Sequence, residues 1–315
     1  MFKIFKLCLL TTFVSLLINN YVFAVDSVEL KKKINNEILT NLDIIKETNY
    51  LTALNTNLKK LSDNEIYEIA EESLIRETIK KSEIQKFFNL ADFEDEKLIN
   101  NYINSIFKKL NFNSKLEFES YLEKFNLKIE DVEKKISIEI LWNQLVSLKY
   151  KDKISINKND ILNKIKNEKL KNKDLIEYEL SEIVIQPKNQ EEFSSLKSEI
   201  SISIDKFGFE TTANKFSVSD TANLGGYIGS IKETQLSDQI RNTLIKLKVG
   251  EFTNPINLGS GFVILYINNK KRVVNEFDEN IIMENMINFE KNKQFENFSQ
   301  IYFNKIKLNT NINDF

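Results

Sequence analysis

A glycine-rich stretch at residues 224–267 constrains the fold of this chain more than any other part of it. It holds most of the seven glycines and one of the two prolines. The pair Gly225 and Gly226, followed by Gly229, predicts a tight loop where the backbone takes positive φ angles or passes close to another segment.

Regular structure is predicted on the C-terminal side of this loop. Apolar residues recur there at helical spacing: Leu236, Ile240, Leu244 and Leu247. That spacing predicts a short amphipathic helix, which ends near Gly250. The run FVILYI at residues 262–267 is rich in β-branched and aromatic residues, so it predicts a central strand.

A further strand is predicted upstream, at residues 178–185, where the sequence reads YELSEIVI. Side chains alternate between the two faces of a strand, so Tyr178, Leu180, Glu182 and Val184 share one face. Burying an isolated carboxylate among apolar side chains is costly. Glu182 must therefore be solvated, hydrogen-bonded or protonated.

These segments together resemble the parvulin (PpiC) domain of peptidyl-prolyl cis-trans isomerases. The resemblance is carried by the order GG-x-x-G, amphipathic helix, LK-x-GE-x-x-x-P and G-x-G-F-x-I. The strand at 178–185 and the segment FSVS at 216–219 resemble the domain's first strand and the segment before its glycines. The chain around them resembles the SurA family of periplasmic chaperones, in a form with a single parvulin domain.

The resemblance implies a pocket for a proline ring, with Ile228, Leu236 and Ile240 as substrate-binding residues. Ile240 stands where the family usually places a phenylalanine, so an apolar wall is kept without the flat ring. Val263, also assigned to substrate binding, stands in GFVI where the family has a histidine.

The polar half of the implied site departs further from the family. The family's first-strand histidine is replaced by Glu182 in LSEI, and its cysteine or aspartate by Ser219. Glu182 and Ser219 are therefore the candidate catalytic residues. Glu182 is either a replacement polar group with a raised pKa or the solvated edge of a degenerate site, held by neighbours such as Ser219, and the second interpretation is preferred.

Composition excludes several other classes of function. The net charge is -2, from 44 basic and 46 acidic residues, which argues against a nucleic-acid binder. The chain has no histidine, so Ser-His and Cys-His nucleophile pairs and histidine-ligated metal sites are excluded. Its one cysteine is Cys8. We expect no metal and no cofactor.

Four segments are predicted along the chain. Residues 1–24 have a basic start, a short apolar run and the ending VFA, typical of a secretory signal peptide, although an uncleaved anchor stays open. Residues 25–173 form a mostly helical domain like the N-terminal domain of SurA. Residues 174–272 form the parvulin-like domain, an inserted antiparallel sheet flanked by helices. Residues 273–315 form a C-terminal helix and strand that pack on the N-terminal domain; a free helix is the alternative. The predicted fold class is α+β.

The predicted function follows from the resemblance. The protein is expected in the periplasm, holding unfolded or nascent exported polypeptides, above all outer-membrane β-barrel precursors, with a degenerate parvulin site. It is expected not to stay in the membrane once the signal is cleaved. Two alternatives stay open: an active isomerase acting on Xaa-Pro bonds of exported proteins, and a scaffold with one fixed partner.

Overall fold

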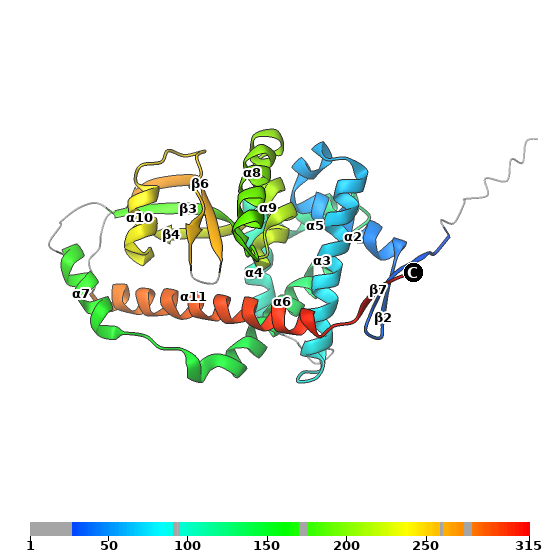
Figure 1. Cartoon of the computed structure of the whole chain (residues 1–315), viewed down its shortest axis with the longest axis horizontal. Helices are drawn as coiled ribbons and strands as arrows, with labels where there is room; N and C mark the ends of the chain where they lie inside the picture. Colours follow the sequence, from blue (N-terminus) through cyan, green and yellow to red (C-terminus); the bar gives the residue numbers. More distant parts are fainter. Residues whose placement is uncertain (1–26, 91–92, 94, 170–174, 259–260, 274–278) are drawn as a thin grey trace, which may run out of the picture.

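The structure is a computed structural model, which describes residues 27–90, 93, 95–169, 175–258, 261–273 and 279–315 (Figure 1). The predicted signal peptide at 1–24 lies outside the described residues. Within the described ranges, no helix is both long and apolar enough to span a membrane.

Helices combine with two antiparallel sheets, which confirms the predicted α+β class. The part before the second sheet comprises β1 (Leu30–Ile34), β2 (Glu37–Thr40), α2 (Asn41–Leu54), η1 (Thr56–Lys60), α3 (Asp63–Ile84), α4 (Glu96–Lys109), α5 (Lys115–Glu123), α6 (Ile129–Tyr150), η3 (Lys151–Lys153) and α7 (Lys158–Lys169). Two of these helices begin at capping boxes, Thr40 with Asp43 and Ser62 with Glu65, so their starts are fixed locally.

The second sheet and its helices follow. They comprise β3 (Leu175–Ile185), α8 (Gln190–Phe207), α9 (Phe209–Phe216), η4 (Asp220–Leu224), β4 (Tyr227–Lys232), η5 (Glu233–Gln235), α10 (Asp238–Leu244), β5 (Ile256–Asn257) and β6 (Phe262–Val273). The strand order is β4-β3-β6-β5, which puts β3 and β6 in the centre. One face of this sheet packs on α8 and α9 through a core that includes Ile183, Ile200 and Ile264. The other face carries the candidate site.

The predicted helix after the glycine loop is shorter than its apolar spacing suggested. Helix α10 begins at Asp238, because the Ser237 hydroxyl caps it by accepting from the backbone N–H of Ile240 at 3.3 Å. Leu236 therefore lies before the helix, where it is 6% exposed and packs in the core of the sheet's second face.

The last elements are the long helix α11 (Glu279–Leu308) and the short strand β7 (Ile312–Asp314). Figure 1 shows α11 running from beneath α10 to the helices of the first part of the chain. Strand β7 pairs antiparallel with β1. Helix α11 packs on α6, where the Trp142 and Tyr302 rings stack with centroids 5.5 Å apart and Trp142 Nε1 donates to Ser299 Oγ at 2.7 Å. We use "helical unit" for β1 to α6 together with α11 and β7.

Helix α7 is a charged helix that packs on α11 through a narrow apolar stripe. Ile161 and Ile165 are buried, and both pack with Met286 of α11. These two isoleucines are one turn apart, so they form a narrow apolar stripe in an otherwise charged sequence.

Candidate functional site

A cavity of about 510 Å³ lies between the second face of the sheet and helix α11. The four predicted substrate-binding residues all line it: Ile228, Leu236, Ile240 and Val263. Leu180, Val184 and Leu265 of the central strands complete an apolar floor. The structure thus brings together the four predicted residues, Ile228 to Val263, which lie up to 35 positions apart along the chain. The predicted proline pocket requires this proximity. Their role as substrate contacts stays a prediction.

A β-bulge sets the position of Ile228. Strand β4 pairs with β3 at Gly229 and Leu180 and next at Tyr227 and Ser181, so Ile228 is the extra residue. A bulge changes the direction in which the side chain of the extra residue points. Here that side chain packs in the pocket core beside Leu236.

The glycine loop fixes the backbone of Glu182. The Glu182 N–H donates to the Gly226 carbonyl oxygen at 2.7 Å. A Cβ on Gly226 would lie 2.1 Å from the Glu182 carbonyl oxygen, and the φ angle of Gly226 is +77°. Only glycine allows this approach, which accounts for the glycine pair in the sequence.

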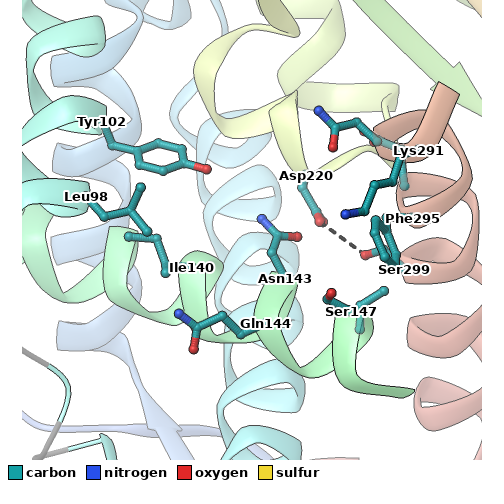
Figure 2. Close-up of a pocket in the computed structure, with 13 residues that line it drawn as sticks. Leu98, Tyr102, Ile140, Asn143, Gln144, Ser147, Asp220, Lys291, Phe295 and Ser299 are labelled. Carbon is teal, nitrogen blue, oxygen red and sulfur yellow. Dashed lines mark hydrogen bonds between the residues drawn. The ribbon is translucent and has the colours of Figure 1, made fainter. Parts of the chain in front are cut away.

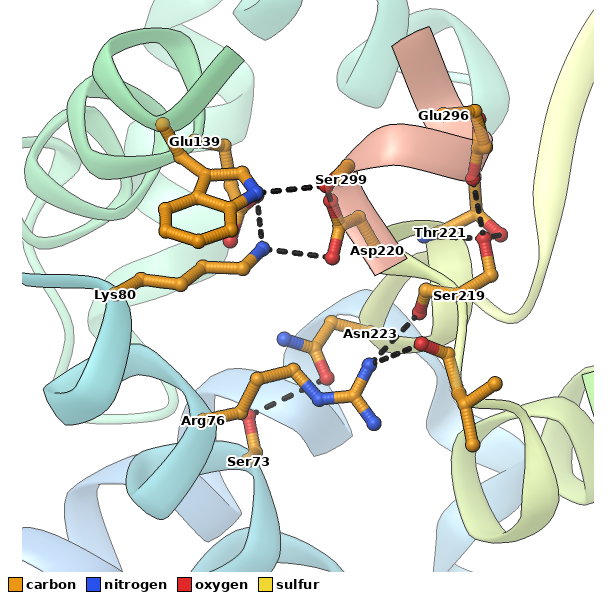
Figure 3. A network of polar contacts seen from close by, with 12 residues as sticks. Ser73, Arg76, Lys80, Glu139, Ser219, Asp220, Thr221, Asn223, Glu296 and Ser299 are labelled. Atoms are coloured by element: carbon orange, nitrogen blue, oxygen red, sulfur yellow. Dashed lines mark hydrogen bonds and ion pairs between the residues drawn. The ribbon is translucent and has the colours of Figure 1, made fainter. Parts of the chain in front are cut away.

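The polar end of the cavity is a cluster of two carboxyl and two hydroxyl groups. The Ser219 side chain is fully buried, and its Oγ donates to Glu182 Oε1 at 2.7 Å. Thr221 Oγ1 donates to the same oxygen at 3.0 Å. Ser219 Oγ also lies 3.2 Å from Oε1 of Glu296, which comes from α11. We call Glu182, Ser219, Thr221 and Glu296 the carboxyl cluster. Of these, Ser219, Thr221 and Glu296 are drawn in Figure 3.

The short contacts of the carboxyl cluster fit one acidic proton held on Glu296. Ser219 has a single hydroxyl proton, so two well-aligned hydrogen bonds to both carboxyl groups require a second donor. With the proton on Glu296, that carboxyl donates to Ser219, and Ser219 donates in turn to an ionised Glu182. Every short contact between these three groups then has a donor and an acceptor.

The electrostatics of the carboxyl cluster favour that proton. Loss of water contact raises the pKa of Glu296 to about 8, with further increases from the negative charges of Glu182 and Asp220. Burial also raises the pKa of Glu182, although hydrogen bonds from Ser219 and Thr221 act in the opposite direction. Glu182 is half-buried and lines the cavity, and its carboxyl is hydrogen-bonded to the predicted neighbour Ser219. Which of the two interpretations of Glu182 holds stays a prediction.

Next to this cluster, a buried lysine joins the sheet domain to the helical unit (Figure 3). Lys80 of α3 is 1% exposed, and its Nζ lies 2.7 Å from Asp220 Oδ1 and 2.7 Å from Glu139 Oε2. Burial opposes the ammonium charge, but the two carboxylates outweigh it and raise the pKa of Lys80. Arg76 of the same helix donates to the Val218 carbonyl oxygen at 2.7 Å. These bonds hold the segment that carries Ser219.

Sequence reasoning did not identify Glu296 or Thr221. Thr221 follows Ser219 by two residues, so the ST-rich segment after FSVS could have pointed to it. Glu296 lies 77 positions beyond Ser219 and has no local signal. In the described part of the chain, no group of three or more acidic or sulfur side chains could hold a metal ion.

A second cavity, of about 480 Å³, lies between α4, α6 and α11. Figure 2 shows Leu98 and Tyr102 of α4 facing Phe295 and Ser299 of α11 across it, with Asp220 at the inner end. Glu296 lines both cavities. This position explains why Glu296 keeps exposed surface although its carboxyl contacts the buried Ser219.

Comparison with protein families matches residues 160–269 to the PPIC-type PPIase (rotamase) domain. The chain therefore contains a PpiC-type domain, which confirms the predicted parvulin-type domain. A search of curated proteins found no match.

Several solved structures are similar to this chain. A PpiC-type peptidyl-prolyl cis-trans isomerase domain is 24% identical, with 32% of this chain and 96% of the other covered and a TM-score of 0.28. PrsA from Bacillus subtilis is 19% identical, with 89% and 91% covered and a TM-score of 0.28. A structure of the SurA-like chaperones PEB4 and Cj1289 of Campylobacter jejuni is 16% identical, with 91% and 98% covered and a TM-score of 0.34. At these TM-scores the similarities carry no functional assignment.

Replacing Gly226 should disturb the site far more than replacing Gly229, which makes the two a matched pair. Both have positive φ angles, but a Cβ on Gly229 meets nothing within 4 Å. We expect Gly229→Ala to lower the free energy of unfolding by about 1–2 kcal/mol, the cost of left-handed backbone alone. Gly226→Ala should cost at least about 2 kcal/mol more, because the Glu182 backbone must move. Urea unfolding measures both, and equal losses would contradict the close approach.

The raised pKa of Glu296 predicts a pH dependence of stability. Between about pH 4.5 and pH 8, the Glu296 carboxyl keeps its proton in the folded state, whereas in the unfolded state it has already released it. The free energy of unfolding should therefore fall as pH rises through this window. Glu296→Gln, which cannot ionise, should show a shallower fall in urea unfolding measured across the window. Glu284→Gln, on an exposed position of the same helix, is the control and should follow the unaltered protein. Parallel curves for all three proteins would refute the shared proton.

Proposed function

We propose that this protein is a folding chaperone of exported polypeptides, whose PpiC-type domain takes proline-containing segments of unfolded clients. The apolar cavity over the sheet supports this proposal most directly. Its floor of Leu180, Val184, Ile228 and Leu236 suits a proline ring, and its volume of about 510 Å³ falls in the range of about 300–1,000 Å³ found for ligand pockets.

We propose outer-membrane β-barrel precursors as the clients and the periplasm as the location. The lipid-facing side chains of such precursors are apolar, so the unfolded chains aggregate in water. A chaperone that binds the unfolded state prevents this by mass action and needs no ATP. The predicted signal peptide at 1–24 would supply export.

In this proposal the site is degenerate as an isomerase. Rotation about the prolyl bond has a barrier of roughly 20 kcal/mol, and an enzyme must favour the twisted amide over both planar forms. The polar groups at the cavity are already bonded to one another: Ser219 to Glu182, and Thr221 to Glu182. They are therefore poorly placed to bond a twisted amide as well.

The holding function is tested with an unfolded barrel protein diluted out of urea. We expect an equimolar amount of this protein to suppress light scattering by at least half. Leu116→Asp, at a position 72% exposed and away from the cavity, is the control and should suppress equally well. Absence of suppression by the unaltered protein would end the chaperone proposal.

An active isomerase is the second candidate, and the carboxyl cluster favours it. A protonated carboxyl at the edge of a proline pocket could donate to the prolyl nitrogen as the amide twists. NMR exchange spectroscopy of short Xaa-Pro peptides measures interconversion directly. The chaperone proposal expects no acceleration above the uncatalysed rate. Acceleration that Ile240→Ala lowers at least tenfold would instead identify an enzyme that works without histidine. Ile240 is only partly buried, so this variant should stay folded.

A further inference from the structure

Helix α11 forms the wall of the proline cavity that faces the sheet. Phe289, Lys293 and Asn297 recur every fourth residue, so they share one helix face. All three line the cavity, opposite Val184 and Val263 of the sheet. The cavity is therefore a slot with an apolar floor and a largely polar roof.

The roof is held by contacts with residues 150–155, which lie outside the PpiC-type domain. The Phe298 ring stacks on Tyr150 with centroids 4.7 Å apart. Gln294 exchanges two hydrogen bonds with the backbone of Ser155, at 3.0 and 2.8 Å. The position of the roof thus depends on packing outside the PpiC-type domain.

Several polar contacts join α11 to the sheet domain beside the slot. Glu296 meets Ser219 at 3.2 Å, and Gln186 donates to Gln300 at 2.8 Å. Ser299 Oγ donates to Asp220 Oδ2 at 3.4 Å, and Asn304 Nδ2 donates to Gln186 Oε1 at 2.7 Å. The cavity between roof and floor leaves room for a chain segment.

The roof also presents exposed polar side chains that have no partner among the described residues. Across the described residues, neither Asn297 nor Lys293 makes a hydrogen bond or ion pair. An amide side chain can donate and accept, and an ammonium group can donate three times. An extended peptide brings backbone N–H and C=O groups that need such partners when they leave water.

We propose that α11 is the second half of the client site. An extended Xaa-Pro segment lies in the slot, with its proline ring on the apolar floor and its backbone groups bonded to Asn297 and Lys293. This assignment rests on the proposed function, because it takes the client to be an unfolded polypeptide.

Binding of a fluorescein-labelled, unstructured 12-residue peptide with a central Ala-Pro, followed by fluorescence anisotropy, tests the roof. We expect Asn297→Ala and Lys293→Ala each to weaken binding about 3- to 10-fold, the range for one lost hydrogen bond. Asn288→Ala, an exposed asparagine of the same helix outside the slot, should bind like the unaltered protein.

Cross-linking provides a second readout that does not depend on affinity. Cys8 is the only cysteine, so Cys8→Ser gives a background in which Asn297→Cys is the one thiol. A bromoacetyl group placed beside the proline of the peptide should alkylate that thiol. Asn288→Cys in the same background should not react above the rate of free cysteine.

The outcomes separate the two proposals. Weaker binding by the roof variants, with selective alkylation at position 297, supports the composite slot. Unchanged affinity together with equal alkylation at positions 288 and 297 overturns it and leaves the proposed function standing. Failure of the unaltered protein to bind the peptide overturns both.

Discussion

The arrangement of this protein depends on one buried cation. Lys80 has almost no contact with water, and it is stabilised only because carboxylates from two other elements meet it. Glu139 belongs to the helical unit, and Asp220 to the segment between the glycine loop and Ser219. Removing one partner of a buried pair leaves an uncompensated charge, with a cost of about 3–5 kcal/mol. The ion pairs of Lys80 therefore join the PpiC-type domain to the helical unit, beside apolar contacts such as those of Phe207 and Leu224 with the helical core.

The orientation of the PpiC-type domain relative to the helical unit decides what lies over the proline cavity. Asp220 adjoins Ser219, so the bond to Lys80 also sets the distance from Ser219 to α11. The same helix then supplies Glu296, the partner that gives the carboxyl cluster its proton. The chain has no histidine; Glu182 and Val263 stand at the two positions where the resembled parvulin family has histidines, and only Glu182 joins the carboxyl cluster. The result is a pocket that keeps the shape for proline but has its polar groups committed to one another.

Local sequence was sufficient for the features that depend on neighbours in the chain. Strand alternation placed Glu182 on the same face as Leu180 and Val184, and all three line the cavity. The same reasoning misplaced Leu236, since Ser237 interrupts the helix within an unbroken apolar spacing. It also paired Glu182 with Ser219 but missed Thr221 and Glu296, and Glu296 reaches the site only through the docking of a distant helix. No periodicity or motif encodes that docking.

The pairing of β7 with β1 has a consequence for how the chain reaches its final state. The helical unit is made from two stretches of sequence that the PpiC-type domain separates, and its core includes Trp142 from the first and Tyr302 from the second. During synthesis, which starts at the N-terminus, the chain can complete the sheet domain first, since all of that domain's strands lie within 100 residues. The helical unit must wait, with its apolar surface uncovered, until α11 has emerged. Contacts of such long sequence separation form slowly. The protein itself is therefore expected to spend part of its synthesis as an unfolded chain in need of protection.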